Sequence, residues 1–218
     1  MIRYRWWLIM KYSAVIPCGG IGSRLNLGYN KILFKVNDSY LIEKTISNFI
    51  LDIDCNEIII VSNSNDIDTL KDILKHPKVK FTLGGSNREE SVYNGLKLVS
   101  SEYVLIHDGA RPNVSKDLIE RIKKGLETKD AVLPIVKSKD ATLIDNKYHQ
   151  SEVHLIQTPQ ACKTSLLLEA MSNVDLAMFK DDISILSYYF NIDFNVVEGS
   201  YSNIKVTTKE DLVLIKEE

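Results

Sequence analysis

The sequence predicts an α/β fold in which a doubly wound, mostly parallel sheet carries helices on both faces. The first observation is that short apolar runs alternate with segments of helical apolar spacing from residue 13 to residue 136. The second is that the apolar runs end in glycine, proline or polar residues, as buried parallel strands do. Strands and helices that alternate in this way form βαβ units, and such units build this kind of sheet.

The predicted elements follow one another as this alternation requires. Strands are expected at residues 14–16, 57–61, 78–83, 103–106 and 131–136. Helices are expected between them at residues 40–51, 66–74, 89–99 and 116–126. The remainder predicts helices at 164–171, 181–189 and 208–218 and short strands at 194–197 and 204–206. We interpret Asp181 and Asp182 as helix-capping residues. Thr208 and Asp211 resemble a capping box in which Asp replaces Glu.

Residues 137–152 break the alternation, because they are polar with scattered apolar residues. Asp145 and Asn146 suit a tight turn between two extended segments, so we expect a protruding β-arm at about residues 137–156. A disordered loop is the alternative. Since a polar, extended excursion is hard to stabilise alone, the arm predicts a homodimer. We see no repeat and no second domain, and we expect residues 1–218 to form one domain.

The composition argues against several classes of function. The chain is 44% hydrophobic and 26% charged, which is ordinary for a globular protein. Its formal net charge of -2 gives no electrostatic case for binding nucleic acid or an anionic membrane. No apolar stretch approaches transmembrane length. The apolar run at residues 6–10 is too short for a signal peptide, and translation could begin at Met10.

The cysteine and histidine residues argue against disulfides and zinc. Cys18, Cys55 and Cys162 are far apart and form no C-x-x-C pair, which predicts a reducing, cytoplasmic compartment. The histidines show no metal-ligand spacing. We therefore expect no metal ion held by protein side chains.

The segment after the first strand carries the strongest functional signal. Gly19, Gly20 and Gly22 allow the backbone to bend tightly and to approach a ligand. Their N–H groups can then face anionic oxygens. Arg24 and Lys31 follow and supply the charge that such a loop needs. The spacing predicts a nucleotidyltransferase loop that binds phosphate.

Two other kinds of nucleotide-binding loop do not match this segment. A dinucleotide-binding fingerprint needs a third glycine, where Leu25 stands. A P-loop needs Gly-Lys followed by Ser or Thr, and the chain contains no such tripeptide. A plain glycine-rich turn with solvated cations stays open. Two further turns, at residues 84–85 and 108–111, also follow predicted strands. Since ligands bind at the carboxyl ends of strands in such sheets, we expect all three turns to line one crevice.

Six short motifs follow one another over nearly the whole chain. They are residues 19–24, Lys31, residues 84–85 with 88–92, residues 107–112, residues 158–160 and residues 202–207. In this order they resemble the cytidylyltransferases that join CTP to 2-C-methyl-D-erythritol 4-phosphate, and relatives that act on ribitol 5-phosphate. The resemblance implies a Rossmann-like nucleotidyltransferase fold with a dimerising arm. It also implies that a phosphate oxygen attacks the α-phosphorus of CTP and pyrophosphate leaves, with Mg²⁺ bound mainly through the CTP phosphates.

The resemblance also implies roles for individual residues. Arg24 and Lys31 would stabilise the transition state at the α-phosphate, and Lys205 would orient the attacking phosphate. The nucleotide would contact Cys18, Gly19, Gly20, Gly22, Gly85, Ser86, Ser91 and Asp108. The acceptor would contact Arg111, Gln150, Thr158 and Lys205, with Asp108 facing it as well. His107 is expected to be a packed strand-end residue rather than an acid–base group.

The chain departs from the family pattern at three positions. Gly109 stands where Ala is common, which we take as a mild change, and Ala141 stands where Thr is expected. Gln150 stands where the family usually has an Arg that reaches across the dimer to the acceptor phosphate. Lys139, Lys147 or His149 could supply the missing charge.

The expected function is therefore cytidylyl transfer from CTP to a small polyol phosphate. 2-C-Methyl-D-erythritol 4-phosphate is the first expectation for the acceptor and ribitol 5-phosphate the second. A paralogue that binds CTP without turnover is the non-enzyme alternative. The presence of Arg24, Lys31, Asp108 and Lys205 favours the enzyme, because a mere binder needs no cations at the α-phosphate.

Overall fold

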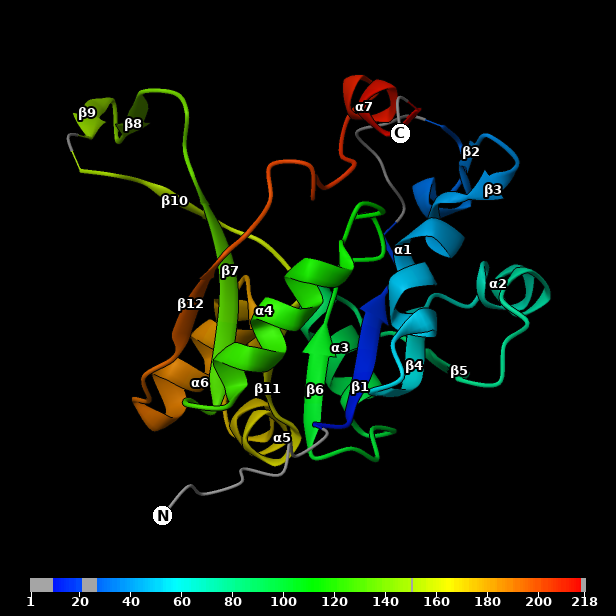
Figure 1. The fold of residues 1–218 in the computed structure, drawn as a ribbon, viewed down its shortest axis with the longest axis horizontal. Coiled ribbons are helices and arrows are strands. Elements are labelled where there is room, and N and C mark those ends of the chain that lie inside the picture. Colours follow the sequence, from blue (N-terminus) through cyan, green and yellow to red (C-terminus); the bar gives the residue numbers. More distant parts are fainter. Residues whose placement is uncertain (1–9, 21–26, 150, 217–218) are drawn as a thin grey trace, which may run out of the picture.

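The computed structural model describes residues 10–20, 27–149 and 151–216. Its centre is an eight-stranded sheet in the order β10-β7-β11-β6-β1-β4-β5, with β12 paired to β7 (Figure 1). The expectations that concern residues 1–9, Gly22, Arg24 and Gln150 fall outside the described residues. No helix of the described residues combines the length and apolarity needed to cross a membrane.

The middle of the sheet is parallel, as predicted. β1 (Tyr12–Pro17) lies between β4 (Cys55–Ser62) and β6 (Tyr103–Ile106) and is parallel to both. β5 (Val79–Leu83) extends the sheet in parallel beyond β4. The carboxyl ends of these strands therefore meet at one edge of the sheet, the upper edge in Figure 1.

Alternate side chains of the central strands enter two separate cores. Ala14 and Ile16 of β1 pack with α1 (Leu41–Leu51) and α4 (Lys116–Leu126). Val15, between them, packs on the other face with α3 (Arg88–Leu96), α5 (Thr164–Ser172) and α6 (Asp182–Phe190). Both faces are covered, so the strands read as continuous apolar runs. The doubly wound α/β prediction is confirmed.

The other half of the sheet is mixed. β11 (Gln160–Lys163) lies between β6 and β7 (Ala131–Lys137) and is antiparallel to both. β10 (His154–Ile156) is also antiparallel to β7, whereas β12 (Asn195–Glu198) is parallel to it. Neither β10 nor β11 was predicted from the sequence. The two central residues of β11, Ala161 and Cys162, are fully buried but small, so they give no strand-like pattern.

The C-terminal expectations were partly wrong. Residues 204–206 form no strand, because the Val206 N–H donates to the carbonyl of Ala110 in the loop after β6 (2.8 Å). The predicted terminal helix begins later than residue 208. Within the described residues it consists of a 3-10 turn, η4 (Glu210–Leu212), and α7 (Val213–Lys216). Asp211 does accept from the N–H groups of Thr207 and Thr208 (2.7 and 2.8 Å), which is half of the predicted capping box.

The predicted arm contains a hairpin. β8 (Thr142–Ile144) pairs with β9 (Lys147–His149), and Asp145 and Asn146 have positive φ angles of 50° and 60°. Two positive φ angles match the type I′ turns of two-residue hairpins. In Figure 1 the arm extends away from the sheet at the upper left. The remaining short elements are η2 (Lys31–Leu33), β2 (Lys35–Val36), β3 (Ser39–Tyr40), α2 (Ile67–Ile73) and η3 (Leu176–Met178).

Candidate active site

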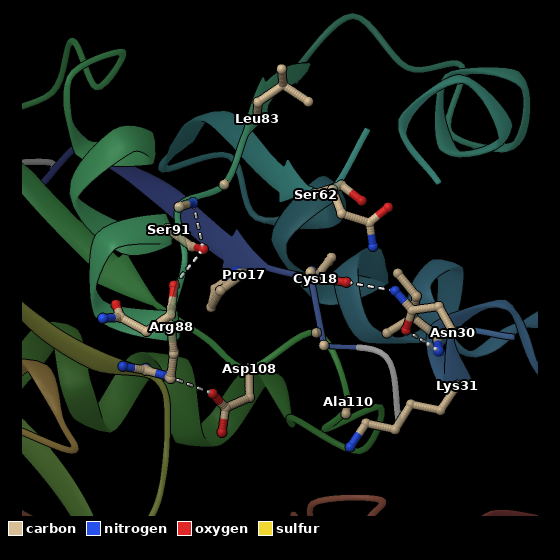
Figure 2. Close-up of a pocket in the computed structure, with 18 of the residues that line it drawn as sticks. Pro17, Cys18, Asn30, Lys31, Ser62, Leu83, Arg88, Ser91, Asp108 and Ala110 are labelled. Carbon is tan, nitrogen blue, oxygen red and sulfur yellow. Dashed lines mark hydrogen bonds and ion pairs between the residues drawn. The ribbon is translucent and has the colours of Figure 1, made fainter. Parts of the chain in front are cut away.

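A cavity of about 710 Å³ opens at the carboxyl edge of β1, β4 and β6 (Figure 2). The three turns predicted to meet there all line it: residues 18–20 after β1, residues 84–86 after β5 and residues 108–109 after β6. Lys31, Arg88, Ser91 and Lys205 also line it. The cavity therefore brings together most of the predicted site residues that lie in the described part of the chain.

One side of the cavity is built from backbone and neutral side chains, and we call residues 18–20, 84–86 and Ser91 the glycine wall. The Gly85 N–H donates to the Ser91 hydroxyl (3.1 Å), and this hydroxyl donates to the Asn87 carbonyl (2.7 Å). The Ser86 N–H donates to the Glu90 carboxylate (2.7 Å). A Cβ on Gly85 would collide with the Cβ of Glu90. Only glycine fits that position as the chain is folded.

Cys18 and Gly109 both line the cavity, and they lie against each other. The Cys18 carbonyl accepts from the Asn30 side-chain amide (2.7 Å), which fixes the start of the loop. Burial and the nearby Asp108 raise the pKa of the Cys18 thiol, so it stays protonated and is a poor nucleophile. A Cβ on Gly109 would lie 2.7 Å from the Cys18 sulfur. In this chain the Cys18 sulfur occupies the space that an alanine Cβ at position 109 would need, so the two positions are matched. The expectation that glycine is a mild change here stays a prediction.

Lys31 joins the first loop to the C-terminal segment. It begins η2, whose N-cap Asn30 accepts from the Ile32 N–H (3.3 Å). The Lys31 ammonium donates to the carbonyl of Val206 (2.7 Å), next to Lys205. Figure 2 shows Lys31 and Asp108 on the same side of the cavity. The two lysines predicted to face phosphate groups therefore belong to one continuous surface.

Asp108 is the centre of an ionic cluster. Its Oδ1 accepts from Arg88 Nε (3.2 Å), and its Oδ2 accepts from Arg111 Nε (3.3 Å) and lies 2.9 Å from Lys205 Nζ. Burial alone would raise the pKa of Asp108, but these three cations hold it well below its usual range. Asp108 is therefore a fixed anion and cannot act as an acid–base group near neutral pH.

Thr158 and His107 support Asp108 from behind. The Thr158 hydroxyl accepts from the Asp108 N–H (3.1 Å) and lies 3.0 Å from His107 Nδ1. His107 Nε2 donates to the Arg111 carbonyl (3.0 Å), so Nδ1 is the acceptor from Thr158. Burial lowers the pKa of His107 to about 4. His107 is a neutral, packed residue, as expected.

Two of the predicted acceptor residues lie behind the cavity surface. Arg111 and Thr158 are not among the described residues that line the cavity. Arg111 also donates to the Asn203 carbonyl (2.8 Å), and Thr158 is only 5% exposed. Their direct contact with an acceptor stays a prediction, as do the roles of Gly22, Arg24 and Gln150.

An ion pair between Arg88 and Asp182 was not predicted from the sequence. Arg88 Nη1 and Nη2 donate to the two oxygens of Asp182 (3.1 and 2.8 Å), which is fully buried. Of the two aspartates, Asp181 is the one whose side chain caps α6, by accepting from the Ser184 N–H (3.0 Å). The interpretation of Asp182 as a cap was therefore incomplete. Together, Arg88, Asp108, Arg111, Asp182 and Lys205 form what we call the charged cluster.

Comparison with known proteins agrees with the motif resemblance. The family model described as 2-C-methyl-D-erythritol 4-phosphate cytidylyltransferase matches residues 12–217. The Bacillus cereus protein of that name is 36% identical over 216 residues, covering 93% of this chain and 95% of its own length.

Solved structures give the same result. The 4-diphosphocytidyl-2C-methyl-D-erythritol synthase of Anaerococcus prevotii matches with a TM-score of 0.82 and 34% identity, covering 96% of both chains. The bifunctional IspDF of Campylobacter jejuni matches with a TM-score of 0.85 and 32% identity over 94% of this chain. This chain spans 54% of that longer one. The chain therefore belongs to the 2-C-methyl-D-erythritol 4-phosphate cytidylyltransferase family, and it is a cytidylyltransferase.

Proposed function

We propose that the cavity at the carboxyl edge of the sheet is where this chain transfers a cytidylyl group from CTP to 2-C-methyl-D-erythritol 4-phosphate and releases pyrophosphate. The observation that carries this proposal is that the neutral glycine wall and three members of the charged cluster, Arg88, Asp108 and Lys205, line the same cavity. A nucleotide base and the phosphates of two substrates need these two environments side by side.

The glycine wall suits the cytidine part of CTP. Backbone N–H and C=O groups of Cys18, Gly19, Gly20, Gly85 and Ser86 can read the edge of a pyrimidine at close range, because glycine places no side chain in the way. The hydrogen bonds of Ser91 hold the second turn in place. We assign Gly22 to the same loop.

The cations suit the transfer step. The reaction brings two anions together, and negative charge grows on the oxygens around the α-phosphorus, so positioning and electrostatic stabilisation are the main needs. Lys31 and Arg24 would stabilise this charge, and Lys205 would orient the attacking phosphate. The protonated Cys18 thiol is consistent with direct transfer without a covalent enzyme intermediate.

The acceptor phosphate would meet Lys205, Arg111 and Thr158, and Gln150 would reach it from the arm. Asp108 would hold Lys205, whose Nζ lies 2.9 Å from Asp108 Oδ2. The charge that Gln150 lacks could come from other arm residues. The Lys139 ammonium lies over the Tyr201 ring at 4.0 Å, which ties it to the base of the arm. Lys147 and His149 are exposed on β9, and we favour them as the compensating groups.

Mg²⁺ fits this site as a companion of the nucleotide. Among the described residues that line the cavity, Asp108 is the one carboxylate, and both its oxygens are in ion pairs. The described residues also contain no cluster of three metal-ligand side chains. The triphosphate would therefore supply the ligands, and the ion would neutralise part of the phosphate charge.

We also propose that the chain is a homodimer joined largely through the arm. The arm carries exposed apolar side chains, among them Leu143, Tyr148 and Leu155, which are 60%, 75% and 51% exposed. Exposed apolar side chains on a thin arm support a contact with a second copy. Sedimentation at micromolar concentration should give a dimer, and a monomer of about 25 kDa would contradict the proposal.

A pyrophosphate-release assay tests the proposed reaction. CTP is supplied with 2-C-methyl-D-erythritol 4-phosphate or ribitol 5-phosphate, with and without Mg²⁺, and UTP replaces CTP as a control. We expect release with CTP, Mg²⁺ and the methylerythritol acceptor. Release with ribitol 5-phosphate alone would contradict the acceptor and leave the nucleotide assignment standing. CTP binding without release from either acceptor would indicate a paralogue without turnover.

A further inference from the structure

We infer that Arg88 and Asp182 are a positioning pair for the acceptor half of the cavity. They hold the Asp108 carboxylate in one orientation, and Asp108 in turn holds Lys205 and Arg111 toward the acceptor phosphate. This inference rests on the proposed function of the cavity. Neither residue would touch the reacting atoms, so both act through Asp108.

The geometry of the pair fixes Arg88. Its two terminal nitrogens bond both oxygens of Asp182 (3.1 and 2.8 Å), which leaves Nε to donate to Asp108 (3.2 Å). The Asp182 side chain is fully buried and that of Arg88 is 22% exposed. A planar guanidinium held at both terminal nitrogens cannot rotate, so its third contact has a fixed direction.

Arg88 then fixes Asp108. Because Oδ1 of Asp108 is held by Arg88, Oδ2 is left for Arg111 and Lys205. The dashed contact between Arg88 and Asp108 can be followed in Figure 2. Lys205 is 39% exposed and lines the cavity. The position of its ammonium therefore depends on a chain of contacts that begins at Asp182.

The charges of the cluster explain why Asp182 is needed. Arg88, Arg111 and Lys205 face the carboxylates of Asp108 and Asp182, and Glu89 Oε1 lies 3.9 Å from Arg88 Nη1. Removing the Asp182 charge would therefore leave the cluster with one positive charge that no carboxylate balances. Without the Asp182 carboxylate, the guanidinium of Arg88 would turn fully to Asp108. It would then compete with Lys205 for the same oxygens. The acceptor half would lose its geometry, whereas the described residues of the glycine wall make no hydrogen bond or ion pair with Asp182.

The Asp182 carboxylate is not needed to cap its helix. Gln160 Oε1 accepts from the N–H groups of Asp182 and Ile183 (3.1 and 3.0 Å), and Asp181 accepts from the Ser184 N–H (3.0 Å). The N-terminus of α6 is thus capped by neighbours. This separation provides a matched control, because Asp181→Asn makes the same chemical change one residue away and keeps the capping oxygen.

The test is steady-state kinetics of Asp182→Asn and Asp181→Asn in the pyrophosphate-release assay, varying each substrate while the other saturates. For Asp182→Asn we expect kcat/KM for the acceptor to fall about 30-fold or more, since removing one partner of a buried charge pair has effects of this size. The KM for CTP should stay within about threefold of wild type. Asp181→Asn should match wild type in both.

Three results would overturn the inference. The first is wild-type kinetics in Asp182→Asn. The second is an equal loss for CTP and acceptor, which would mean general structural damage. If Asp182→Asn does not fold, Arg88→Lys decides, because it keeps the charge and loses the two-pronged contact. The third result that would overturn the inference is an unchanged acceptor KM in Arg88→Lys. A wild-type chain that releases no pyrophosphate contradicts the proposed function and the pair with it, whereas an active wild type with unaffected variants contradicts the pair alone.

Discussion

The glycine wall lines one side of the cavity and the charged cluster lies at another, where Arg88, Asp108 and Lys205 reach the cavity surface. Different forces hold these two regions. The second turn of the glycine wall comes from residues close in sequence, joined by neutral hydrogen bonds such as that from Gly85 to Ser91. The charged cluster joins residues as far apart as Arg88 and Asp182, 94 positions from each other, through ion pairs. A shape-based wall is sensitive to single methyl groups, whereas an ionic cluster is sensitive to single charges. The two halves should therefore respond to different substitutions.

Lys31→Ala should give the largest effect, because Lys31 stands where the two halves meet. Loss of a charged contact made mainly in the transition state costs roughly 3 kcal/mol, or ~100-fold in kcat. Arg24→Ala should behave alike. The measurement is kcat at saturating CTP, with circular dichroism as a check on folding. A variant that turns over at nearly the wild-type rate would remove that residue from the catalytic assignment.

Gly85→Ala tests the glycine wall by shape alone. The new Cβ must push Glu90 away and disturb its bond to the Ser86 N–H. Overpacking of this kind costs about 1–3 kcal/mol, so we expect the KM for CTP to rise about tenfold or more, with an unchanged acceptor KM. Urea unfolding of Gly85→Ala and Gly20→Ala measures the packing effect without CTP, since a Cβ at Gly20 would meet nothing within 4 Å of the chain itself and should leave the stability unchanged. Equal changes in the KM for CTP and the KM for the acceptor would contradict the assignment of the glycine wall to CTP alone.

His107 lies behind the charged cluster, and its titration makes the folding stability of the chain depend on pH. Burial lowers its pKa from 6.5 to about 4, so the unfolded chain takes up a proton first as the pH falls through this range. Stability is then full above pH 6.5 and declines toward pH 4. We expect the free energy of unfolding to fall by about 2 kcal/mol between pH 6.5 and about pH 5.

Urea unfolding at several pH values measures this decline. In His107→Gln the free energy of unfolding should change much less over the same range, whatever its absolute value. Equal pH dependence in wild type and variant would mean that another group titrates there.

Cys18 and Gly109 should be coupled. Gly109→Ala alone should lower the free energy of unfolding by about 1–3 kcal/mol, because its Cβ would lie 2.7 Å from the Cys18 sulfur. In a Cys18→Ala background most of this loss should disappear. Urea denaturation of the two single variants and the double variant gives the coupling energy, and additive losses would contradict the proposed clash.

Gln150→Arg should have the smallest effect and act on the acceptor alone. Exchanging a neutral hydrogen bond for a charge-assisted one gains about 1–2 kcal/mol, so the acceptor KM should fall roughly 5- to 30-fold while the KM for CTP stays nearly constant. If Lys147 or His149 already supplies the charge, Gln150→Arg will do little. Lys147→Ala or His149→Ala would then raise the acceptor KM instead.

The sequence predicted those parts whose signal is local. The apolar runs located β1, β4, β5, β6 and β7, because strands buried on both faces leave unbroken runs. β11 was not predicted, since small buried residues such as Ala161 occur in helices, strands and loops alike. The glycine turns and Asp108 were found through motifs. The ion pair of Arg88 and Asp182 was missed, because two charges far apart in sequence form no pattern until the fold brings them together.

A crystal structure of the chain with CTP and Mg²⁺ tests the division of the cavity most directly. The account predicts the cytosine against the backbone of residues 18–20 and 84–86, the α-phosphate beside Lys31, and the Asp108–Lys205 ion pair intact. A base that lies against Asp108 and Lys205, or a triphosphate bound outside this cavity, would contradict it.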